Sequence, residues 1–185
     1  MNAARHGFAV LATLVALTAT MVLAEHAVGQ TAHAVHSGPT VVYLVRHAER
    51  AEDGTDDPPL STAGEARARL VADMLRDAGV ERVHTTDYKR TRATAAPLSE
   101  RLGLPLETYE GGDLTGLAER IRAEGGRHLV VGHSNTTPEA VAALAGEPGR
   151  PIDEMEYDRL YVVTLTPDGA ATVLLRFGAP FSPPG

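Results

Sequence analysis

Two histidines follow apolar stretches of the kind that form buried strands. Arg46 and His47 come directly after "VVYLV", and His133 comes directly after "HLVVG". A single histidine at the end of a strand is commonly structural, whereas two of them, one beside an arginine, indicate a site. The carboxyl ends of parallel strands meet at one edge of a sheet, where α/β proteins bind their ligands. We therefore expect these three side chains to form the exposed mouth of one site.

Imidazole and guanidinium groups together suit the transfer of a phosphoryl group. A neutral imidazole is a competent nucleophile toward phosphorus and needs neither a thiol nor a metal-bound hydroxide. Guanidinium groups offer fixed donors to the phosphoryl oxygens and do not titrate. A second imidazole, when protonated, adds another donor, and an acid must then protonate the leaving oxygen.

A further source of positive charge lies in "TTDYKRTRATA", where Lys89, Arg90 and Arg92 stand at the start of a predicted helix. The first turn of a helix also points backbone N–H groups toward an anion. Helical geometry places Arg90 and Arg92 about 200° apart, so only one of them can face the site. The charge argument alone does not choose between the two arginines.

Apolar runs alternate with helical patterns along the chain after residue 40. Strands are predicted over 40–45, 82–86, 104–108 and 128–133, and helices over 61–79, 88–103, 113–126 and 136–146. Two further strands are predicted within 159–178, around a Pro-Asp-Gly turn. This alternation predicts a three-layer, doubly wound, mostly parallel α/β sheet with helices on both faces.

Four short motifs resemble those of the histidine phosphatase superfamily, the phosphoglycerate mutase-like group. They are "VRHAE", "LSTAGE", "TDYKRTRATA" and "VVGHSN", and they occur in the family's order over nearly all of residues 41–178. Ala48 replaces the glycine that is common after the first histidine, and Thr86 stands at the position of the family's serine. Each motif alone is weak evidence, but the four together are strong.

The resemblance implies roles for particular residues. His47 would be the nucleophile that forms a phosphohistidine, and Arg46, Arg90 and His133 would hold the phosphoryl oxygens. The register of the motif selects Arg90, which leaves Arg92 on a solvated face of its helix.

The general acid is the least defined member of the site. Larger members of the family use an acidic residue between the second and third motifs, where this chain has Glu107, Glu110 and Asp113. Asp113 is the first choice as possible general acid, although it equally suits a helix N-cap, and Glu110 is the second choice. Asn135 is expected to bind phosphate from the start of a helix, unless it only caps that helix.

Two other polar residues near these motifs have competing interpretations. Glu49 is close enough in sequence to orient the His47 ring or an attacking water, and it equally suits an ion pair with Arg50. His84, on the short predicted strand 82–86, is expected to be packed in the core.

Length, charge and composition restrict the remaining possibilities. The chain has 185 residues and a formal net charge of -7, which suits one domain and argues against nucleic-acid binding. It contains no cysteine, which excludes disulfides, thiol catalysis and iron–sulfur clusters. The absence of HExxH, and of a carboxylate-rich cluster at the two strand ends, predicts a reaction without metal or other cofactor.

The first residues resemble an export signal. Residues 1–24 have a basic start and an apolar stretch, which indicates a signal peptide or an uncleaved anchor; 25–39 is a predicted linker and 40–185 the working domain. We expect a periplasmic, extracellular or cell-surface location, with membrane contact only if the leader is uncleaved.

The small domain leaves no room for the insertions that form substrate lids in larger relatives. This argues against a mutase and favours a phosphohydrolase acting on a phosphorylated small molecule or a phosphoprotein. The alternative is a non-catalytic phospho-ligand binder on the same fold.

Overall fold

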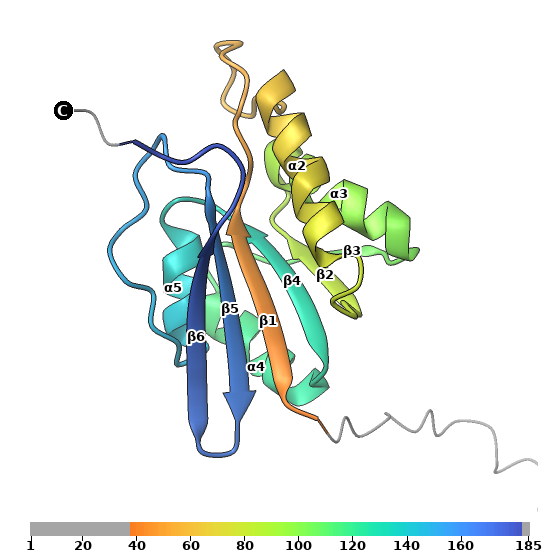
Figure 1. Cartoon of the computed structure of the whole chain (residues 1–185), viewed down its shortest axis with the longest axis vertical. Coiled ribbons are helices and arrows are strands. Elements are labelled where there is room, and N and C mark those ends of the chain that lie inside the picture. Colours follow the sequence, from red (N-terminus) through yellow and green to blue (C-terminus); the bar gives the residue numbers. More distant parts are fainter. Residues whose placement is uncertain (1–37, 183–185) are drawn as a thin grey trace, which may run out of the picture. The chain divides into compact units, whose positions relative to one another are not determined.

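A six-stranded sheet forms the middle layer of the domain in this computed structural model, which describes residues 38–182 (Figure 1). Its strands are β1 (Thr40–Arg46), β2 (Arg82–Thr85), β3 (Leu106–Thr108), β4 (Arg127–Gly132), β5 (Arg159–Thr166) and β6 (Gly169–Arg176). The order across the sheet is β3-β2-β4-β1-β5-β6. The first four of these are mutually parallel, whereas β5 runs antiparallel to both of its neighbours, β1 and β6.

The helices cover both faces of this sheet. Helices α2 (Thr62–Leu75) and α3 (Lys89–Leu102) pack against each other and share one apolar cluster with the sheet. Helices α4 (Leu114–Glu124) and α5 (Thr136–Ala143) form the other outer layer with a second cluster. The predicted fold class, a doubly wound and mostly parallel α/β sheet, is confirmed.

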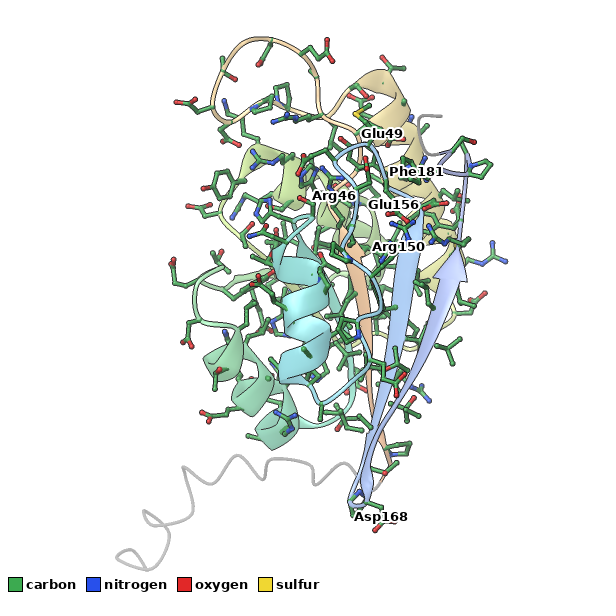
Figure 2. All side chains as sticks on the ribbon, turned by 90° about the vertical axis from the view of Figure 1, so that its left-hand side faces the viewer. Arg46, Glu49, Arg150, Glu156, Asp168 and Phe181 are labelled. Atoms are coloured by element: carbon green, nitrogen blue, oxygen red, sulfur yellow. The ribbon has the colours of Figure 1, made fainter. Side chains whose placement is uncertain are left out.

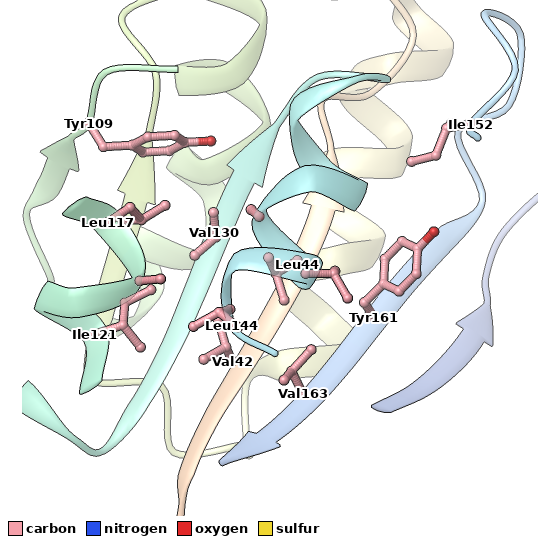
Figure 3. Close-up of a cluster of buried hydrophobic side chains, with 13 residues drawn as sticks. Val42, Leu44, Tyr109, Leu117, Ile121, Val130, Leu144, Ile152, Tyr161 and Val163 are labelled. Atoms are coloured by element: carbon pink, nitrogen blue, oxygen red, sulfur yellow. The ribbon is translucent and has the colours of Figure 1, made fainter. Parts of the chain in front are cut away.

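Alternation along the central strand β1 divides the core between the two faces. Val42 and Leu44 point into the cluster under α4 and α5, where they meet Tyr161 of β5 (Figure 3). Val45 points the opposite way, into the cluster under α2 and α3. Because side chains alternate with a period of two, a strand buried on both faces needs the continuous apolar run that the sequence has here.

Local signals in the sequence set the ends of the helices. The Ser61 hydroxyl accepts a hydrogen bond from Gly64 N at 3.1 Å and begins α2, and the Asp113 carboxylate does the same for α4 with Gly116 N at 2.9 Å. Gly103 ends α3 with a φ of 67°, a conformation that favours glycine. Pro97 lies inside α3 without ending it.

The register of the parallel strands brings two distant segments together. In the β1–β4 pair, Arg46 lies opposite Gly132, and His47 N donates to Gly132 O at 2.8 Å. The residues that follow these two strands, His47 and His133, therefore emerge side by side at one edge of the sheet, as the sequence predicted.

The predicted leader, 1–24, and most of the predicted linker, 25–39, lie outside the described residues. Within 38–182, none of the helices has the length and apolar character that crossing a membrane requires.

Candidate active site

A pocket of about 570 Å³ opens at the carboxyl ends of β1, β2 and β4. It lies at the end of the sheet that carries Arg46, opposite the end marked by Asp168 (Figure 2). The pocket is lined by Arg46, His47, Arg50, Thr86, Tyr88, Arg90, Glu110, Gly111, Gly112, His133, Ser134, Asn135, Thr136 and Glu154. The sequence-predicted site residues thus meet in one place, with the exception of Asp113.

The His47 ring has a defined orientation. Its Nδ1 atom lies 2.8 Å from the carbonyl oxygen of Ala48, which can only accept, so Nδ1 carries the proton. Burial lowers the pKa of His47 to about 3, and the charges of Arg46 and His133 act in the same direction, although the bond to Ala48 opposes them. The ring is therefore neutral at pH 7, and its Nε2 atom has a free lone pair.

His133 lies beside His47, with ring centroids 5.4 Å apart in an edge-to-face arrangement. Its Nε2 atom is 3.0 Å from the Thr86 hydroxyl, which donates in turn to the Thr91 hydroxyl at 3.0 Å. Since Thr86 uses its proton on Thr91, His133 Nε2–H is the donor in the first of these bonds. Burial lowers the pKa of His133 to about 4, and Arg90 contributes to this shift.

Arg46 is fixed by a turn of the chain more than 100 residues away. Its Nη1 atom donates to the carbonyl oxygens of Asp153 and Glu154, both at 2.8 Å, and to that of Glu156 at 3.1 Å. The guanidinium carbon lies 4.2 Å from the centroid of the Tyr157 ring. Its Nε atom is buried without a hydrogen-bond partner. A buried donor without a partner costs free energy.

The turn that holds Arg46 is itself held by a buried carboxylate. Glu156 has no exposed surface and accepts hydrogen bonds from Arg150, Arg159 and Arg176, at distances between 2.6 and 3.0 Å. Figure 2 labels Glu156 and Arg150. Burial alone would raise the pKa of Glu156, but the bonds from Arg159 and Arg176 outweigh it and bring the pKa to about 2. The carboxylate stays charged and anchors the turn.

Arg90 and Arg92 occupy different surroundings, as their helical spacing requires. Arg90 lines the pocket with 12% of its side chain exposed, and its Nε atom is buried without a hydrogen-bond partner. Its guanidinium carbon lies 4.4 Å from the centroid of the Tyr88 ring. Arg92 lies outside the pocket and is 3.3 Å from Asp87. The register predicted from the motif places the right arginine at the pocket.

Of the three candidate acids, only one lines the pocket. Glu110 lines the pocket together with the two glycines that follow it. Asp113 does not line it, because its carboxylate caps α4 on Gly116 N. Glu107 lies on β3, where it pairs with Arg82 at 3.2 Å. The first choice for the acid is therefore a structural cap in this structure, and the second choice is the one that reaches the pocket.

Asn135 lies three residues after the end of β4 and lines the pocket, as predicted. It occupies the N-cap position of α5, but its side chain makes no capping hydrogen bond. The side chain is therefore available to a ligand in the pocket.

Two acidic residues near the pocket could not be identified from the sequence. Glu154 lines the pocket, and its carboxylate lies 3.0 Å from the Ser134 hydroxyl and 3.3 Å from Arg46 Nη2. Asp57 accepts from the backbone N of Lys89 at 3.0 Å and lies 3.4 Å from Arg90. Asp57 therefore takes the first backbone donor of α3, which we expected to face a bound anion.

Glu49 has neither of its predicted partners. Its carboxylate forms an ion pair with Arg67 of α2 at 2.8 Å, so it neither orients the His47 ring nor pairs with Arg50. A separate contact of the Glu49 backbone explains the "LSTAGE" motif, because a Cβ on Gly64 would collide with the carbonyl oxygen of Glu49. The motif lets α2 begin directly against the strand end that carries His47.

Arg46 and His47 are less exposed than we expected for side chains at the end of a strand. Arg46 is 5% and His47 4% exposed, because Tyr157 covers the arginine and also lies against the histidine ring. Ala48 is buried with Leu60 and Ala68 in a small apolar cluster of its own. Its methyl group fills space there, which accounts for an alanine at the position where the family commonly has glycine.

This α/β sheet, with two histidines and two arginines at one edge, has the architecture of histidine phosphatases and phosphoglycerate mutase-like proteins. Residues 42–112 match the sequence model of the histidine phosphatase superfamily (branch 1). That range includes His47 and Arg90 and ends before His133. Together with the fold, the match supports the assignment of the chain to this superfamily.

Curated relatives match about a third of the chain. A probable phosphoglycerate mutase GpmB of Yersinia enterocolitica is 38% identical over 73 residues, which cover 36% of this chain and 34% of that protein. The corresponding GpmB protein of Serratia proteamaculans is 44% identical over 68 residues, 34% of this chain and 32% of the relative. The chain thus spans about a third of the length of these relatives.

Solved structures match over most of the domain. The protein histidine phosphatase SixA, in complex with tungstate, is 25% identical with a TM-score of 0.58, over 73% of this chain and 94% of SixA. A mycobacterial glucosyl-3-phosphoglycerate phosphatase is 14% identical with a TM-score of 0.60, over 77% of this chain and all of that protein (100%). The second likeness is one of fold alone.

Proposed function

We propose that this protein is a metal-independent phosphohydrolase that cleaves phosphomonoesters through a phosphohistidine on His47. The observation that carries the proposal is the bond from His47 Nδ1 to Ala48 O, 2.8 Å long, inside a pocket that Arg46, Arg90 and His133 also line. This bond fixes the tautomer and leaves Nε2 as the nucleophilic atom. The likeness to SixA and the match to the superfamily support the same reaction class.

In the first step, the lone pair of His47 Nε2 attacks phosphorus, and the bond between phosphorus and the ester oxygen breaks. Glu110 donates a proton to the leaving oxygen, so an alcohol departs and a phosphohistidine remains. In the second step, water attacks phosphorus and gives a proton to Glu110 as the N–P bond breaks. Inorganic phosphate leaves, and His47 and Glu110 return to their starting protonation states.

The phosphoryl oxygens find their donors on the pocket wall. Arg46 and Arg90, which both line the pocket, supply two of them. His133 is neutral in the free protein, and the negative charge of a bound phosphoryl group raises its pKa and favours the charged donor form. The donors are fixed before the substrate arrives, which is the arrangement that stabilises charge in a transition state.

The substrate class is a phosphorylated small molecule or a phosphorylated side chain of another protein. A pocket of about 570 Å³ holds a phosphoryl group and part of the group that carries it. The mouth carries acidic side chains, Glu110 and Glu154, beside the arginines. This argues against leaving groups that carry several negative charges of their own.

Hydrolysis of p-nitrophenyl phosphate in the presence of EDTA tests the proposal, with His47→Asn as the matched variant. The asparagine side-chain N–H can replace the bond to Ala48 O, but it offers no nucleophile. Turnover by the parent, none by the variant, and equal melting temperatures are expected. Acid-labile phosphate on the parent alone after a rapid quench would identify the intermediate.

The alternative, a non-catalytic phospho-ligand binder, gives a different result in the same experiment. Neither protein would turn over substrate, yet inorganic phosphate would raise the melting temperature of both. Activity that EDTA abolishes would contradict both functions.

A further inference from the structure

Two fully buried histidines lie side by side under α4, away from the phosphoryl pocket. His84 of β2 and His128 of β4 are both 0% exposed, and His84 Nε2 lies 2.9 Å from His128 Nδ1. Glu124, the last residue of α4, completes a group whose potential ligand atoms all lie within 4.8 Å of one another. None of the three residues lines the phosphoryl pocket.

The hydrogen bonds of this cluster leave one buried atom unsatisfied. Gly125 O can only accept, so His128 Nε2, at 2.8 Å from it, carries a proton. Because burial favours neutral rings, His128 Nδ1 is then an acceptor, and His84 Nε2–H is its donor. His84 Nδ1 is left with a bare lone pair, and it has no hydrogen-bond partner. It faces a second acceptor, Glu107 Oε2, at 3.6 Å.

We propose that His84, His128 and Glu124 form a binding site for a divalent transition-metal ion. Two nitrogens bound to one ion at about 2.1 Å lie roughly 3 Å apart when they subtend a right angle at it. The observed 2.9 Å between His84 Nε2 and His128 Nδ1 fits this arrangement as well as it fits a hydrogen bond. Glu124 Oε2, which is buried and has only an ion pair with Arg82 Nε at 3.2 Å, would be the third ligand.

The surroundings supply the outer partners that a metal-bound histidine requires. Such a histidine donates its second ring N–H to a carbonyl or carboxylate, which orients the ring. His128 already donates to Gly125 O. When a metal takes His84 Nε2, the ring proton moves to Nδ1, which then faces Glu107 as a donor. In the metal-free protein two acceptors, His84 Nδ1 and Glu107 Oε2, face each other. In the metal-bound protein a donor faces an acceptor.

The charges of the cluster leave room for a cation. Two positive groups are already present. Arg82 lies 3.2 Å from Glu107 and 3.2 Å from Glu124. Burial lowers the pKa of His84, and the charge of Arg120 acts in the same direction. An ion that binds Glu124 displaces Arg82 from it, and Arg82 keeps Glu107. Two imidazoles and one carboxylate favour zinc, nickel or copper over magnesium or calcium, which prefer oxygen ligands.

The ion would tie together β2, β4 and α4, and would take no part in the proposed hydrolysis. His84 stands two residues before Thr86, which bonds His133 in the pocket. A metal at this site therefore stabilises the strand that presents Thr86. Its removal should lower the melting temperature and leave turnover in EDTA in place.

Titration of the full chain with Ni²⁺ and Zn²⁺, followed by calorimetry, tests the site. Because His6, His26, His33 and His36 could also bind these ions, the parent for the test carries alanine at all four positions. One equivalent is expected to bind and to raise the melting temperature. Glu124→Gln should weaken binding at least tenfold, whereas Glu119→Gln, exposed on the same helix, should leave it unchanged.

A second variant separates a metal site from a merely structural cluster. In Glu107→Gln the new amide N–H can donate to the bare Nδ1 of His84. We expect a higher melting temperature without metal, together with a loss of metal affinity of about 10-fold to 100-fold. Neither variant truncates a buried histidine, so both should fold.

Two results would overturn the proposal. One is the absence of binding once the four N-terminal histidines are replaced. The other is binding that Glu124→Gln and Glu107→Gln both leave unchanged, which would place the ion elsewhere.

Discussion

The carboxylate of Glu154 lies 3.3 Å from Nη2 of Arg46, so a side chain of the protein shares the guanidinium that we assign to the phosphoryl group. Glu154 is 74% exposed and reaches this position from the turn that fixes Arg46. An incoming phosphate meets the negative charge of this carboxylate at the arginine. We therefore expect Glu154 to weaken anion binding in the free protein.

Replacement of Glu154 by glutamine should tighten the binding of inorganic phosphate. An exposed charge of this kind contributes about 0.2–1 kcal/mol, which corresponds to a decrease in the inhibition constant of up to roughly fivefold. Competitive inhibition of p-nitrophenyl phosphate hydrolysis measures the effect. Glu139→Gln, on the exposed side of α5, is the control. Weaker inhibition in Glu154→Gln would mean that this carboxylate supports the site.

The two arginines at the start of α3 should differ sharply in their effect on phosphate affinity. Arg90 lines the pocket with a buried Nε, whereas Arg92 lies outside it. We expect Arg90→Ala to raise the dissociation constant of phosphate by at least tenfold, since a charge-assisted bond contributes about 1.5–3 kcal/mol. Arg92→Ala should change it less than twofold. Calorimetric titration would contradict the assignment if the ranking were reversed.

Glu110→Gln should affect substrates according to their leaving groups. A proton donor typically contributes about 10²–10⁴-fold to the rate when the leaving oxygen is strongly basic. The rate of glycerol 2-phosphate hydrolysis should therefore fall by a factor of that order. The rate with p-nitrophenyl phosphate should fall little, because its phenolate leaves without a proton. Asp113→Asn, which keeps a cap for α4, is the matched control. An equal loss on both substrates would assign Glu110 to binding.

The pocket histidines should remain neutral well below pH 6.5. Burial lowers the pKa of His47 to about 3 and that of His133 to about 4. In an NMR titration of ring carbon shifts without phosphate, neither residue should titrate between pH 8 and pH 5. The unfolded chain binds these protons near pH 6.5, so the free energy of unfolding should fall as pH drops from 6.5 toward 4. A midpoint near 6.5 for His47 would contradict its burial.

Glu156→Gln should be strongly destabilising. The substitution leaves Arg150, Arg159 and Arg176 around a neutral group, and loss of one partner of a buried ion pair costs about 3–5 kcal/mol. Urea unfolding measures the loss at pH 7. With a folded pKa of about 2 against 4.5, the stabilisation by Glu156 is complete above pH 4.5 and is lost as pH falls through 2. A loss below 1 kcal/mol would show that the arginines re-pair with other groups.

Local patterns were sufficient to predict the sheet, its helices and the meeting of His47 with His133. Apolar runs and helix caps are signals that act over a few residues. Because parallel strands end at the same edge of a sheet, two residues distant in sequence are predicted to lie together. The choice of Arg90 over Arg92 needed only helical geometry and the motif register.

Contacts made by loops distant in sequence could not be predicted in this way. Glu154 reaches Arg46 across 108 residues, and Asp57 reaches Arg90 across 33. No pattern near either acid encodes its partner. For Asp113 the local pattern is present but has two interpretations, because an acidic residue before a helix suits both a helix cap and a catalytic acid. Only the path of the loop decides which of the two roles it has.

Arg46 belongs both to the pocket and to the turn at residues 153–156. One guanidinium closes that turn through three carbonyl oxygens, and the same side chain lines the pocket. Occupancy of the pocket and order in the turn are therefore thermodynamically linked, and the linkage is reciprocal. An anion that restrains Arg46 stabilises the ordered turn. In return, a partner that binds and orders the turn increases the affinity of the pocket for phosphate.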